Sequence, residues 1–276
     1  MRDVLKNLID GLSGALLKLI ECKLTTLPRR SAREQGEKTK MVEILFVHGA
    51  LVRDGAWWWQ RVAERIHERT GTVSRAVELP SCGEGTMSGT ADLLEDARAL
   101  RGALDDVDEA VVVGHSYGGT VIAEGADHPA TRHLVYITSY LPDVGQSQAD
   151  LMSGEQDPVG VAPGDDGTVR IAGYTASSFG DRFWQDLTDE ETRAEAWDRL
   201  TAQSVGAFGT PTTRAAWRGR PSTYLVCTED RSTSLALQRF HAGRATRSID
   251  LAAGHHPFLS RPDLVAEELI RVLRTD

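Results

Sequence analysis

A serine on a sharp turn between a strand and a helix constrains this chain more than any other feature. Residues 110–113 are apolar and predict a buried strand, and residues 120–123 predict the start of a helix. Between them lies the pattern G-x-S-x-G, here Gly114-His115-Ser116-Tyr117-Gly118, with a further glycine directly after it. Such a turn is too tight for side chains at the glycine positions, so Ser116 is expected in a strained conformation with its hydroxyl clear of the sheet. The pattern predicts a nucleophilic serine, although an ordinary tight turn can carry the same letters.

A nucleophilic serine needs a histidine as general base and an acid that orients the histidine. On this kind of sheet the three follow along the chain as serine, acid and histidine. Residues 248–251 predict a last strand, and His255 lies on the loop just after it. Residues 222–227 predict an earlier strand that leads into Glu229 and Asp230, and either carboxylate is a candidate acid. Asp143, after the strand predicted at 133–139, is a third and less favoured candidate.

Two backbone N–H groups are expected to stabilise the oxyanion that forms when the serine attacks a carbonyl. Tyr117 N–H, at the N-terminus of the helix after the serine, is the first predicted donor. Residues 42–47 predict an apolar strand that leads into His48-Gly49-Ala50, and a glycine here lets the following backbone approach the nucleophile. Ala50 N–H is therefore the second predicted donor. His48 could be a catalytic base, but a side chain that braces the turn by hydrogen bonds is favoured.

Strand and helix patterns alternate through most of the chain after residue 40. Strands are predicted at 42–47, 73–79, 110–114, 133–139, 223–228 and 245–251, and helices at 57–69, 88–104, 117–126, 232–242 and 262–274. This alternation predicts an α/β fold with a doubly wound, mainly parallel sheet of about six strands flanked by helices. The core is expected in two parts, residues 41–141 and 218–276.

Residues 142–217 interrupt the alternation after the fourth core strand and predict a small helical cap. Frequent Asp, Gly and Pro favour a loop through 153–167, and helical segments are expected around 176–187 and 189–202. The aromatic residues here should fill the cap's own core or line a substrate pocket; they are Phe179, Phe183, Trp184, Trp197, Phe208 and Trp217. Phe183, Trp184 and His256 are predicted to bind substrate.

The chain resembles the α/β-hydrolase fold enzymes, and among them the compact group of methyl esterases, hydroxynitrile lyases and many bacterial esterases. The resemblance is carried, in chain order, by His48-Gly49-Ala50, Trp57-Trp58-Trp59, residues 78–83, Gly114 to Gly119, Leu141-Pro142-Asp143, residues 227–231 and Gly254 to Leu259. It covers almost everything from Met41 onward. It implies that Asp230 is the acid and that His255, directly after a glycine, is the base.

Three departures from the resembling enzymes bear on the reaction. The loop at 51–56 is slightly longer than usual, so the entrance to the site is expected to differ. The hydroxynitrile lyases carry a lysine directly after the catalytic histidine, whereas this chain has His256, mostly neutral at pH 7 by its ordinary pKa of about 6.5. Lyase chemistry is therefore disfavoured. Epoxide hydrolases and haloalkane dehalogenases of this fold use an aspartate where Ser116 stands, which excludes those reactions.

These residues predict a serine hydrolase that cleaves a small, rather hydrophobic ester, lactone or thioester through an acyl-enzyme on Ser116. Two other classes of function stay open, because this scaffold hosts many reactions. A lyase or cyclase would form a carbonyl product without an acyl-enzyme, and His256 would matter as much as His255. A ligand-binding protein would have no turnover.

The composition narrows the partners and the location. The formal net charge is −9 and no basic stripe follows the motifs, so nucleic acid is not an expected partner. The three scattered cysteines, Cys22, Cys82 and Cys227, predict reduced thiols and a cytoplasmic location. No apolar run approaches the length of a membrane span. No metal-ligand spacing or phosphate-binding loop is present, so neither a metal nor another cofactor is expected, and a homodimer is left open.

Residues 1–40 differ from the rest of the chain. All five lysines lie there, and the basic residues Lys and Arg after Met41 are arginines only. Residues 4–24 carry apolar side chains at mostly helical spacing, and residues 29–40 predict a charged linker. Three interpretations remain: sequence that is not part of the fold, a helix that docks on the body or on a second subunit, and a membrane-surface anchor. The anchor is least favoured, because the polar face carries both signs of charge.

Overall fold

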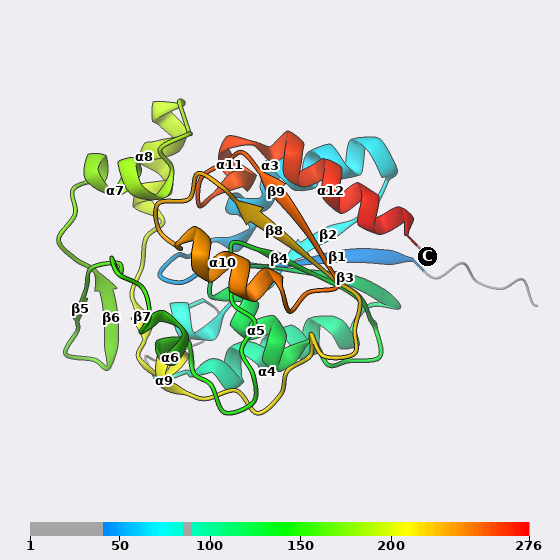
Figure 1. Ribbon diagram of the computed structural model, residues 1–276, viewed down its shortest axis with the longest axis horizontal. Helices are drawn as coiled ribbons and strands as arrows, with labels where there is room; N and C mark the ends of the chain where they lie inside the picture. Colours follow the sequence, from blue (N-terminus) through cyan, green and yellow to red (C-terminus); the bar gives the residue numbers. More distant parts are fainter. Residues whose placement is uncertain (1–40, 85–89, 276) are drawn as a thin grey trace, which may run out of the picture. The chain divides into compact units, whose positions relative to one another are not determined.

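A six-stranded parallel β-sheet is the centre of the fold in a computed structural model that describes residues 41–84 and 90–275 (Figure 1). Its strands are β1 (Val42–Val47), β2 (Ser74–Ala76), β3 (Glu109–His115), β4 (Thr131–Ile137), β8 (Ser222–Cys227) and β9 (Arg247–Leu251), in the spatial order β2-β1-β3-β4-β8-β9. All neighbouring pairs are parallel. The predicted α/β fold is confirmed. The interpretations of residues 1–40 lie outside the described residues.

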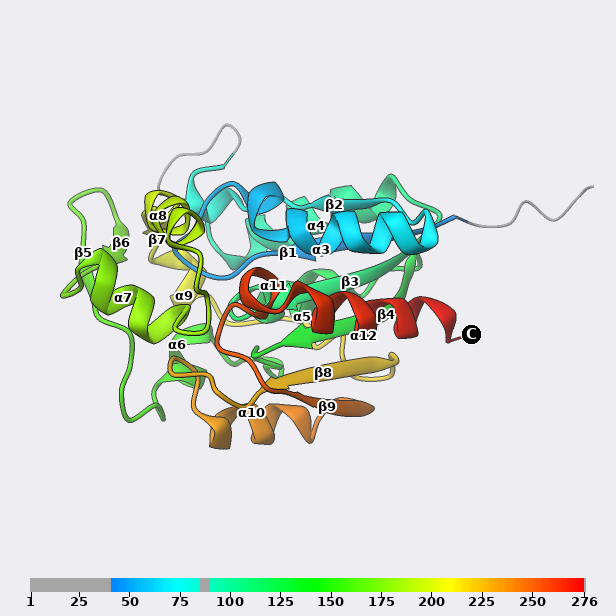
Figure 2. The same cartoon turned by 90° about the horizontal axis from the view of Figure 1, so that it is seen from above.

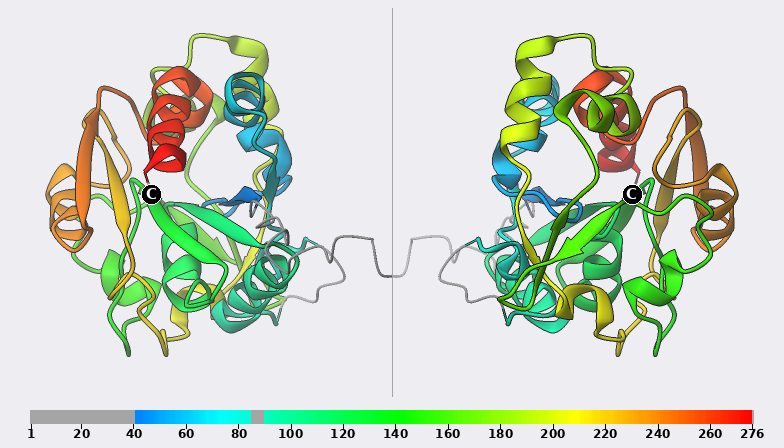
Figure 3. Two further views of the ribbon diagram at one scale, coloured as in Figure 1. Left: turned by 90° about the vertical axis from the view of Figure 1, so that its right-hand side faces the viewer. Right: turned by 90° about the vertical axis from the view of Figure 1, so that its left-hand side faces the viewer.

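Both faces of this sheet are buried, which explains why its central strands are almost continuously apolar. Along β1, Ile44 and Phe46 join one hydrophobic cluster, whereas Leu45 and Val47 join a second cluster on the other face. Helices α3 (Gly55–Thr70), α11 (Pro257–Ser260) and α12 (Pro262–Arg274) contribute to the first cluster. Helices α4 (Leu93–Asp105), α5 (Gly118–Gly125) and α10 (Leu235–Ala242) contribute to the second. Figure 3 shows α3 and α12 on one side of the sheet and α4 and α5 on the other.

Local signals set the ends of the longer helices. Helix α3 begins after Asp54, whose side chain accepts a hydrogen bond from Trp57 N–H, and it ends at Gly71 with a φ of 73°. Helix α4 begins at a capping box, in which Asp92 and Glu95 each accept a hydrogen bond from the other's backbone N–H. A short 3₁₀ helix, η1 (Pro80–Cys82), leads from the β2 side of the sheet toward α4. These capping residues place the start of α3 two residues before the predicted start at residue 57 and the start of α4 five residues after the predicted start at residue 88.

The cap leaves the sheet after β4 and returns at β8, as predicted, and it holds α6 (Gln148–Met152), α7 (Ala176–Phe183), α8 (Glu190–Asp198) and α9 (Gly206–Gly209). It also contains an antiparallel sheet that the sequence analysis did not predict, made of β5 (Val161–Pro163), β6 (Thr168–Ile171) and β7 (Gln203–Ser204). Strand β5 lies in the stretch predicted as loop. Strands of two to four residues are too short for a recognisable alternation of apolar and polar residues. Figure 2 shows α7, α8, β5 and β6 beyond one end of the six-stranded sheet.

An aromatic cluster joins the cap to the core. Phe179 and Phe183 stack with ring centroids 4.1 Å apart, and Trp184 lies 4.9 Å from Phe179. These three side chains are buried and belong to the same cluster as Trp58 of α3. The cap aromatics therefore fill a core, and Phe179, Phe183 and Trp184 also line a cavity.

Candidate active site

Ser116 lies on the turn between β3 and α5 with a φ of 49°, a left-handed conformation that is uncommon for a residue with a side chain. The glycines around it are required by close packing. A Cβ atom on Gly114 would lie 2.7 Å from the Gly118 carbonyl oxygen. A Cβ atom on Gly118 would overlap the Val47 carbonyl, and one on Gly119 would overlap the Ser139 hydroxyl. The turn thus combines backbone strain with an exclusion of side chains, as a nucleophile turn requires.

His255, on the loop after β9, is paired with Asp230, on the loop after β8. The Nδ1–H of His255 donates to Asp230 Oδ2 at 2.7 Å, and both side chains are buried. Asp230 also accepts hydrogen bonds from Ser232 N–H at 2.6 Å, from Thr233 N–H at 3.1 Å and from the Thr138 hydroxyl. Burial alone would raise the pKa of Asp230, but the charge and hydrogen bond of His255, with the other donors, lower it below its ordinary value. Asp230 is therefore held as a carboxylate.

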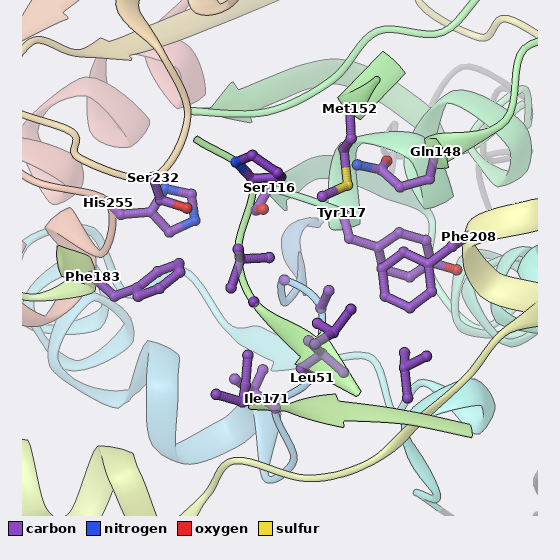
Figure 4. A pocket seen from close by; sticks show the side chains of 18 of the residues that line it. Leu51, Ser116, Tyr117, Gln148, Met152, Ile171, Phe183, Phe208, Ser232 and His255 are labelled. Atoms are coloured by element: carbon purple, nitrogen blue, oxygen red, sulfur yellow. The ribbon is translucent and has the colours of Figure 1, made fainter. Parts of the chain in front are cut away.

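The His255–Asp230 pair leaves one ring nitrogen, Nε2, for Ser116. Figure 4 shows the His255 ring and the Ser116 hydroxyl on the same side of a cavity, and both residues line it. Among the described residues no hydrogen bond joins Ser116 Oγ to His255. Contacts of this kind are often loose in a site without substrate and tighten in the complex. The arrangement places a free imidazole nitrogen and the serine hydroxyl on the same cavity, as proton transfer between them requires.

Among the described residues, neither of the two other candidate acids forms a hydrogen bond or ion pair with His255. Asp143 forms ion pairs with Arg218 at 2.5 Å and with Arg244 at 3.4 Å. Glu229 contributes its backbone to the β8–β9 region, where its N–H donates to the Ala253 carbonyl. Of the three carboxylates weighed from the sequence, the structure brings Asp230 to His255.

The two predicted oxyanion donors both border the cavity. Ala50 and Tyr117 line it beside Ser116, and among the described residues neither backbone N–H has a hydrogen-bond acceptor. Tyr117 directly precedes helix α5, whose positive dipole end adds to the field at this point. Two unsatisfied donors next to a strained serine can hold a negatively charged oxygen.

A buried network that the sequence analysis missed ties these two donors together. Asp96 of α4 accepts hydrogen bonds from the Tyr117 hydroxyl at 2.7 Å and from the Ser81 hydroxyl at 2.6 Å. Gln203 of β7 donates to Ser81 Oγ at 2.9 Å, and its Oε1 accepts from Leu51 N–H at 2.9 Å. The cap strand β7 thus helps to hold the backbone next to Ala50. No local motif points to Gln203, because Leu51 lies 152 residues away along the chain.

His48 and His115 brace the loops around the nucleophile. His48 Nε2 lies 2.8 Å from Glu84 Oε2, and its Nδ1–H donates to the Gly49 carbonyl at 2.8 Å. Burial alone would lower the pKa of His48, but the hydrogen bond and the charge of Glu84 raise it above its ordinary value. His115 Nε2–H donates to the His255 carbonyl at 2.8 Å and so holds the loop of the base. Both histidines act as structural braces, and no sequence pattern points to Glu84.

The cavity beside Ser116 has a volume of about 700 Å³, and most of its wall is apolar. The core contributes Leu51 and Tyr117, and the cap contributes side chains such as Met152, Ile171 and Phe208 (Figure 4). A cavity of this size accepts a ligand with many non-hydrogen atoms. A simple acetate ester would leave much of it empty.

The three residues predicted to bind substrate all border this cavity: Phe183, Trp184 and His256. His256 is buried, and its Nδ1–H donates to the Phe183 carbonyl at 2.9 Å. Burial, followed by the charge of His255, lowers the pKa of His256 to about 3. His256 is therefore a neutral wall residue at neutral pH and cannot supply a fixed positive charge.

Other kinds of site find no support within residues 41–84 and 90–275. No group of three or more His, Cys, Asp or Glu there is placed to hold a metal ion. No helix in the same part of the chain is long and apolar enough to cross a membrane.

Comparisons with known proteins identify the family. A family model described as "Alpha/beta hydrolase family" matches residues 44–268. The alpha/beta hydrolase nvfD of Aspergillus novofumigatus is 30% identical over 251 residues, which cover 84% of this chain and 94% of that protein. Methylesterase 8 of Arabidopsis thaliana is 30% identical over 125 residues, or 43% of this chain and 45% of that protein.

A solved structure has the same fold. A pyrethroid hydrolase from Sphingobium faniae JZ-2 superposes with a TM-score of 0.71 at 24% identity, covering 84% of this chain and 97% of that one. The family match spans both parts of the core and the cap between them. It includes Ser116, Asp230 and His255. The chain belongs to the α/β-hydrolase family of enzymes.

Proposed function

We propose that this enzyme hydrolyses a hydrophobic carboxylic ester through an acyl-enzyme on Ser116, with His255 as general base and acid and Asp230 as its orienting carboxylate. One observation carries the proposal. The strained Ser116 turn after β3, the buried Asp230 after β8 and His255 after β9 meet at one end of the sheet, beside a large apolar cavity. The name methylesterase, carried by one relative, supports the same chemistry.

In the first half of the reaction, His255 Nε2 removes the Ser116 proton as Oγ attacks the ester carbonyl carbon. The carbonyl oxygen becomes negatively charged and accepts hydrogen bonds from Ala50 N–H and Tyr117 N–H. The protonated His255 then gives its proton to the departing alcohol, and the acyl group stays on Ser116.

In the second half, a water molecule attacks the acyl carbon while His255 removes its proton. The same two N–H groups hold the new oxyanion, and His255 returns the proton to Ser116 as the acid leaves. Asp230 stays ionised throughout, since its lowered pKa keeps a negative charge beside the imidazolium. The pair therefore stabilises the charge that forms on His255 in both transition states.

The apolar wall supports a substrate that is mostly hydrophobic, and an ester, lactone or thioester all present the same carbonyl to Ser116. Both cysteines that the structure describes, Cys82 and Cys227, are buried free thiols. They support the proposal that the enzyme acts in the reducing cytoplasm.

A panel of p-nitrophenyl esters with increasing acyl length tests the proposal, with the wild type and Ser116→Ala compared in parallel. We expect turnover by the wild type, a loss of roughly 10⁴-fold or more in kcat/KM for Ser116→Ala, and a preference for chains longer than acetyl. If the wild type turns over none of the esters, or Ser116→Ala matches it, ester hydrolysis is wrong. A lyase reaction, which would act without an acyl-enzyme, or ligand binding would then replace it.

A further inference from the structure

One side-chain amide interrupts the apolar wall of the cavity. Gln148, the first residue of α6, is 1% exposed, yet it lines the cavity that Ser116 also lines. Its Oε1 accepts a hydrogen bond from the Thr120 hydroxyl at 2.5 Å. Thr120 is itself fully buried on α5, the helix that begins directly after the nucleophile turn. The amide is thus anchored to the catalytic side of the core through its oxygen.

The NH₂ group of the same amide is left free. Among the described residues Gln148 Nε2 has no hydrogen-bond acceptor, and Figure 4 shows the nitrogen end of the amide turned toward the Met152 side chain on the cavity wall. Its neighbours in that view, Met152, Tyr117 and Phe208, present a thioether and two rings. A donor that faces a cavity and has no protein acceptor favours ligands that supply one, because such a ligand replaces the hydrogen bond that the N–H otherwise makes to water.

The charges around the cavity limit what that acceptor can be. Glu155 is the one carboxylate that lines the cavity within the described residues, and no arginine lines it there. Glu155 Oε1 accepts a hydrogen bond from Ser234 N–H at 2.9 Å. A ligand carboxylate near Gln148 would therefore lose its hydration without gaining a counter-ion. A neutral oxygen loses much less hydration, and one hydrogen bond from Gln148 can offset that loss.

We propose that Gln148 Nε2–H binds a second, uncharged oxygen of the substrate, away from the ester that Ser116 attacks. The substrate class is then a largely apolar ester that carries an additional carbonyl or ether oxygen. Thr120 acts as a positioning residue, because its hydroxyl fixes which end of the amide faces the cavity. This inference rests on the proposed ester hydrolysis at Ser116 and adds a selectivity for substrates that is due to Gln148.

Matched pairs of p-nitrophenyl esters test this assignment. One member of each pair has a saturated straight acyl chain, and the other has a carbonyl in place of one CH₂ at successive positions along that chain. The measured quantity is the ratio of kcat/KM for the oxo ester to kcat/KM for its partner. With the carbonyl at one or two positions of the chain, we expect this ratio to be roughly two- to tenfold higher in the wild type than in Gln148→Met. Methionine has a similar length and no N–H donor.

Two further variants separate the hydrogen bond from a change of shape. Thr120→Val removes the hydroxyl that anchors Oε1, and it should reduce the same ratio to a value between those of the wild type and Gln148→Met. Met152→Leu changes the shape of the cavity wall beside the amide but keeps the N–H donor, so it can change kcat/KM for both members of a pair while the ratio stays above that of Gln148→Met. A ratio that is equal in the wild type and Gln148→Met at every chain position overturns the inference while ester hydrolysis stands.

Binding supplies a readout that does not need turnover. The same ester pairs are titrated into Ser116→Ala protein and into the Ser116→Ala, Gln148→Met double variant, and tryptophan fluorescence is followed, since Trp184 borders the cavity. If no ester is hydrolysed but the oxo esters bind more tightly only when Gln148 is present, the proposed reaction fails and the Gln148 site stands. If the two proteins bind both members of each pair equally, the site is overturned whatever the reaction.

Discussion

The cavity has two walls that are built in different ways. On the core side, the acid and the base are held by several directed bonds: Asp230 accepts from five donors, and His255 is fixed at both its ring and its carbonyl. On the cap side, the wall consists mainly of apolar side chains, and strand β5 is exposed along its whole length. The core wall therefore has little freedom to change without loss of the reaction. The cap wall can change its shape and, with it, the substrates that fit.

The largest expected effect lies on the core wall. Asp230→Asn should lower kcat by roughly 10³- to 10⁴-fold, since the amide no longer stabilises the imidazolium and can favour the wrong ring tautomer. Steady-state kinetics on a p-nitrophenyl ester measures this. Asp143→Asn is the matched control, because Asp143 also follows a sheet strand but pairs with arginines instead of His255. Equal losses in the two variants would contradict the assignment of the acid.

A smaller effect is expected where the cap supports the core. Gln203→Leu removes the acceptor of Leu51 N–H and the donor to Ser81, so the backbone that carries Ala50 loses its anchor. We expect kcat to fall about tenfold, less than the loss of a whole oxyanion donor, with a smaller change in KM. Gln60→Leu, on the exposed face of α3, controls for the loss of an amide. A change confined to KM would show that Gln203 shapes the cavity and does not position the oxyanion loop.

On the cap wall itself, Ile171→Ala should mainly change which esters bind. The shorter side chain enlarges the cavity on the β6 side, so KM should shift by a few fold and the preferred acyl chain should lengthen. The ester panel measures both. A fall in kcat as large as that of Asp230→Asn would erase the distinction between the two walls.

The smallest effect concerns stability at the edge of the site. Glu84→Gln should lower the free energy of unfolding by about 1 kcal/mol where the His48–Glu84 pair is fully charged. Because the pKa of His48 is raised in the folded protein, protonated His48 stabilises the fold at pH values below its ordinary pKa of 6.5. This stabilisation is lost as the pH rises through the raised pKa of the folded state. Because the pKa of Glu84 is lowered in the folded protein, ionised Glu84 stabilises the fold at pH values above its ordinary pKa of 4.5. This stabilisation is lost as the pH falls through the lowered pKa of the folded state. Urea denaturation should therefore show the largest difference between those two pH values and a smaller one at alkaline pH.

Much of the core wall could be predicted from the sequence, because its signals are local. The apolar runs place β3, β8 and β9, the glycine spacing marks the turn at Ser116, and a histidine directly after a strand indicates the base. The choice between Glu229 and Asp230 needed either the resemblance to known enzymes or the structure. The geometry favours Asp230, whose Oδ2 lies 2.7 Å from His255 Nδ1.

The cap wall and the bracing contacts could not be predicted in the same way. Gln148, Gln203 and Glu84 owe their roles to partners that lie 28, 152 and 36 residues away in the sequence. Glutamine and glutamate are common on protein surfaces, so their presence alone carries no signal of burial. The short strands β5 and β6 give no pattern either, because their pairing depends on the sheet they form together.

The order of the strands sets the order in which a growing chain becomes competent. Strand β4 is synthesised before the cap, and its neighbour β8 is synthesised after it. The β4 edge of the sheet therefore stays unpaired while the whole cap is synthesised. Ser116 is also synthesised long before the base, because His115 beside it is separated from His255 by 140 residues of chain. In the proposed mechanism, a growing chain therefore contains its nucleophile long before it contains its base, and we expect no activity until β8 and β9 have joined the sheet.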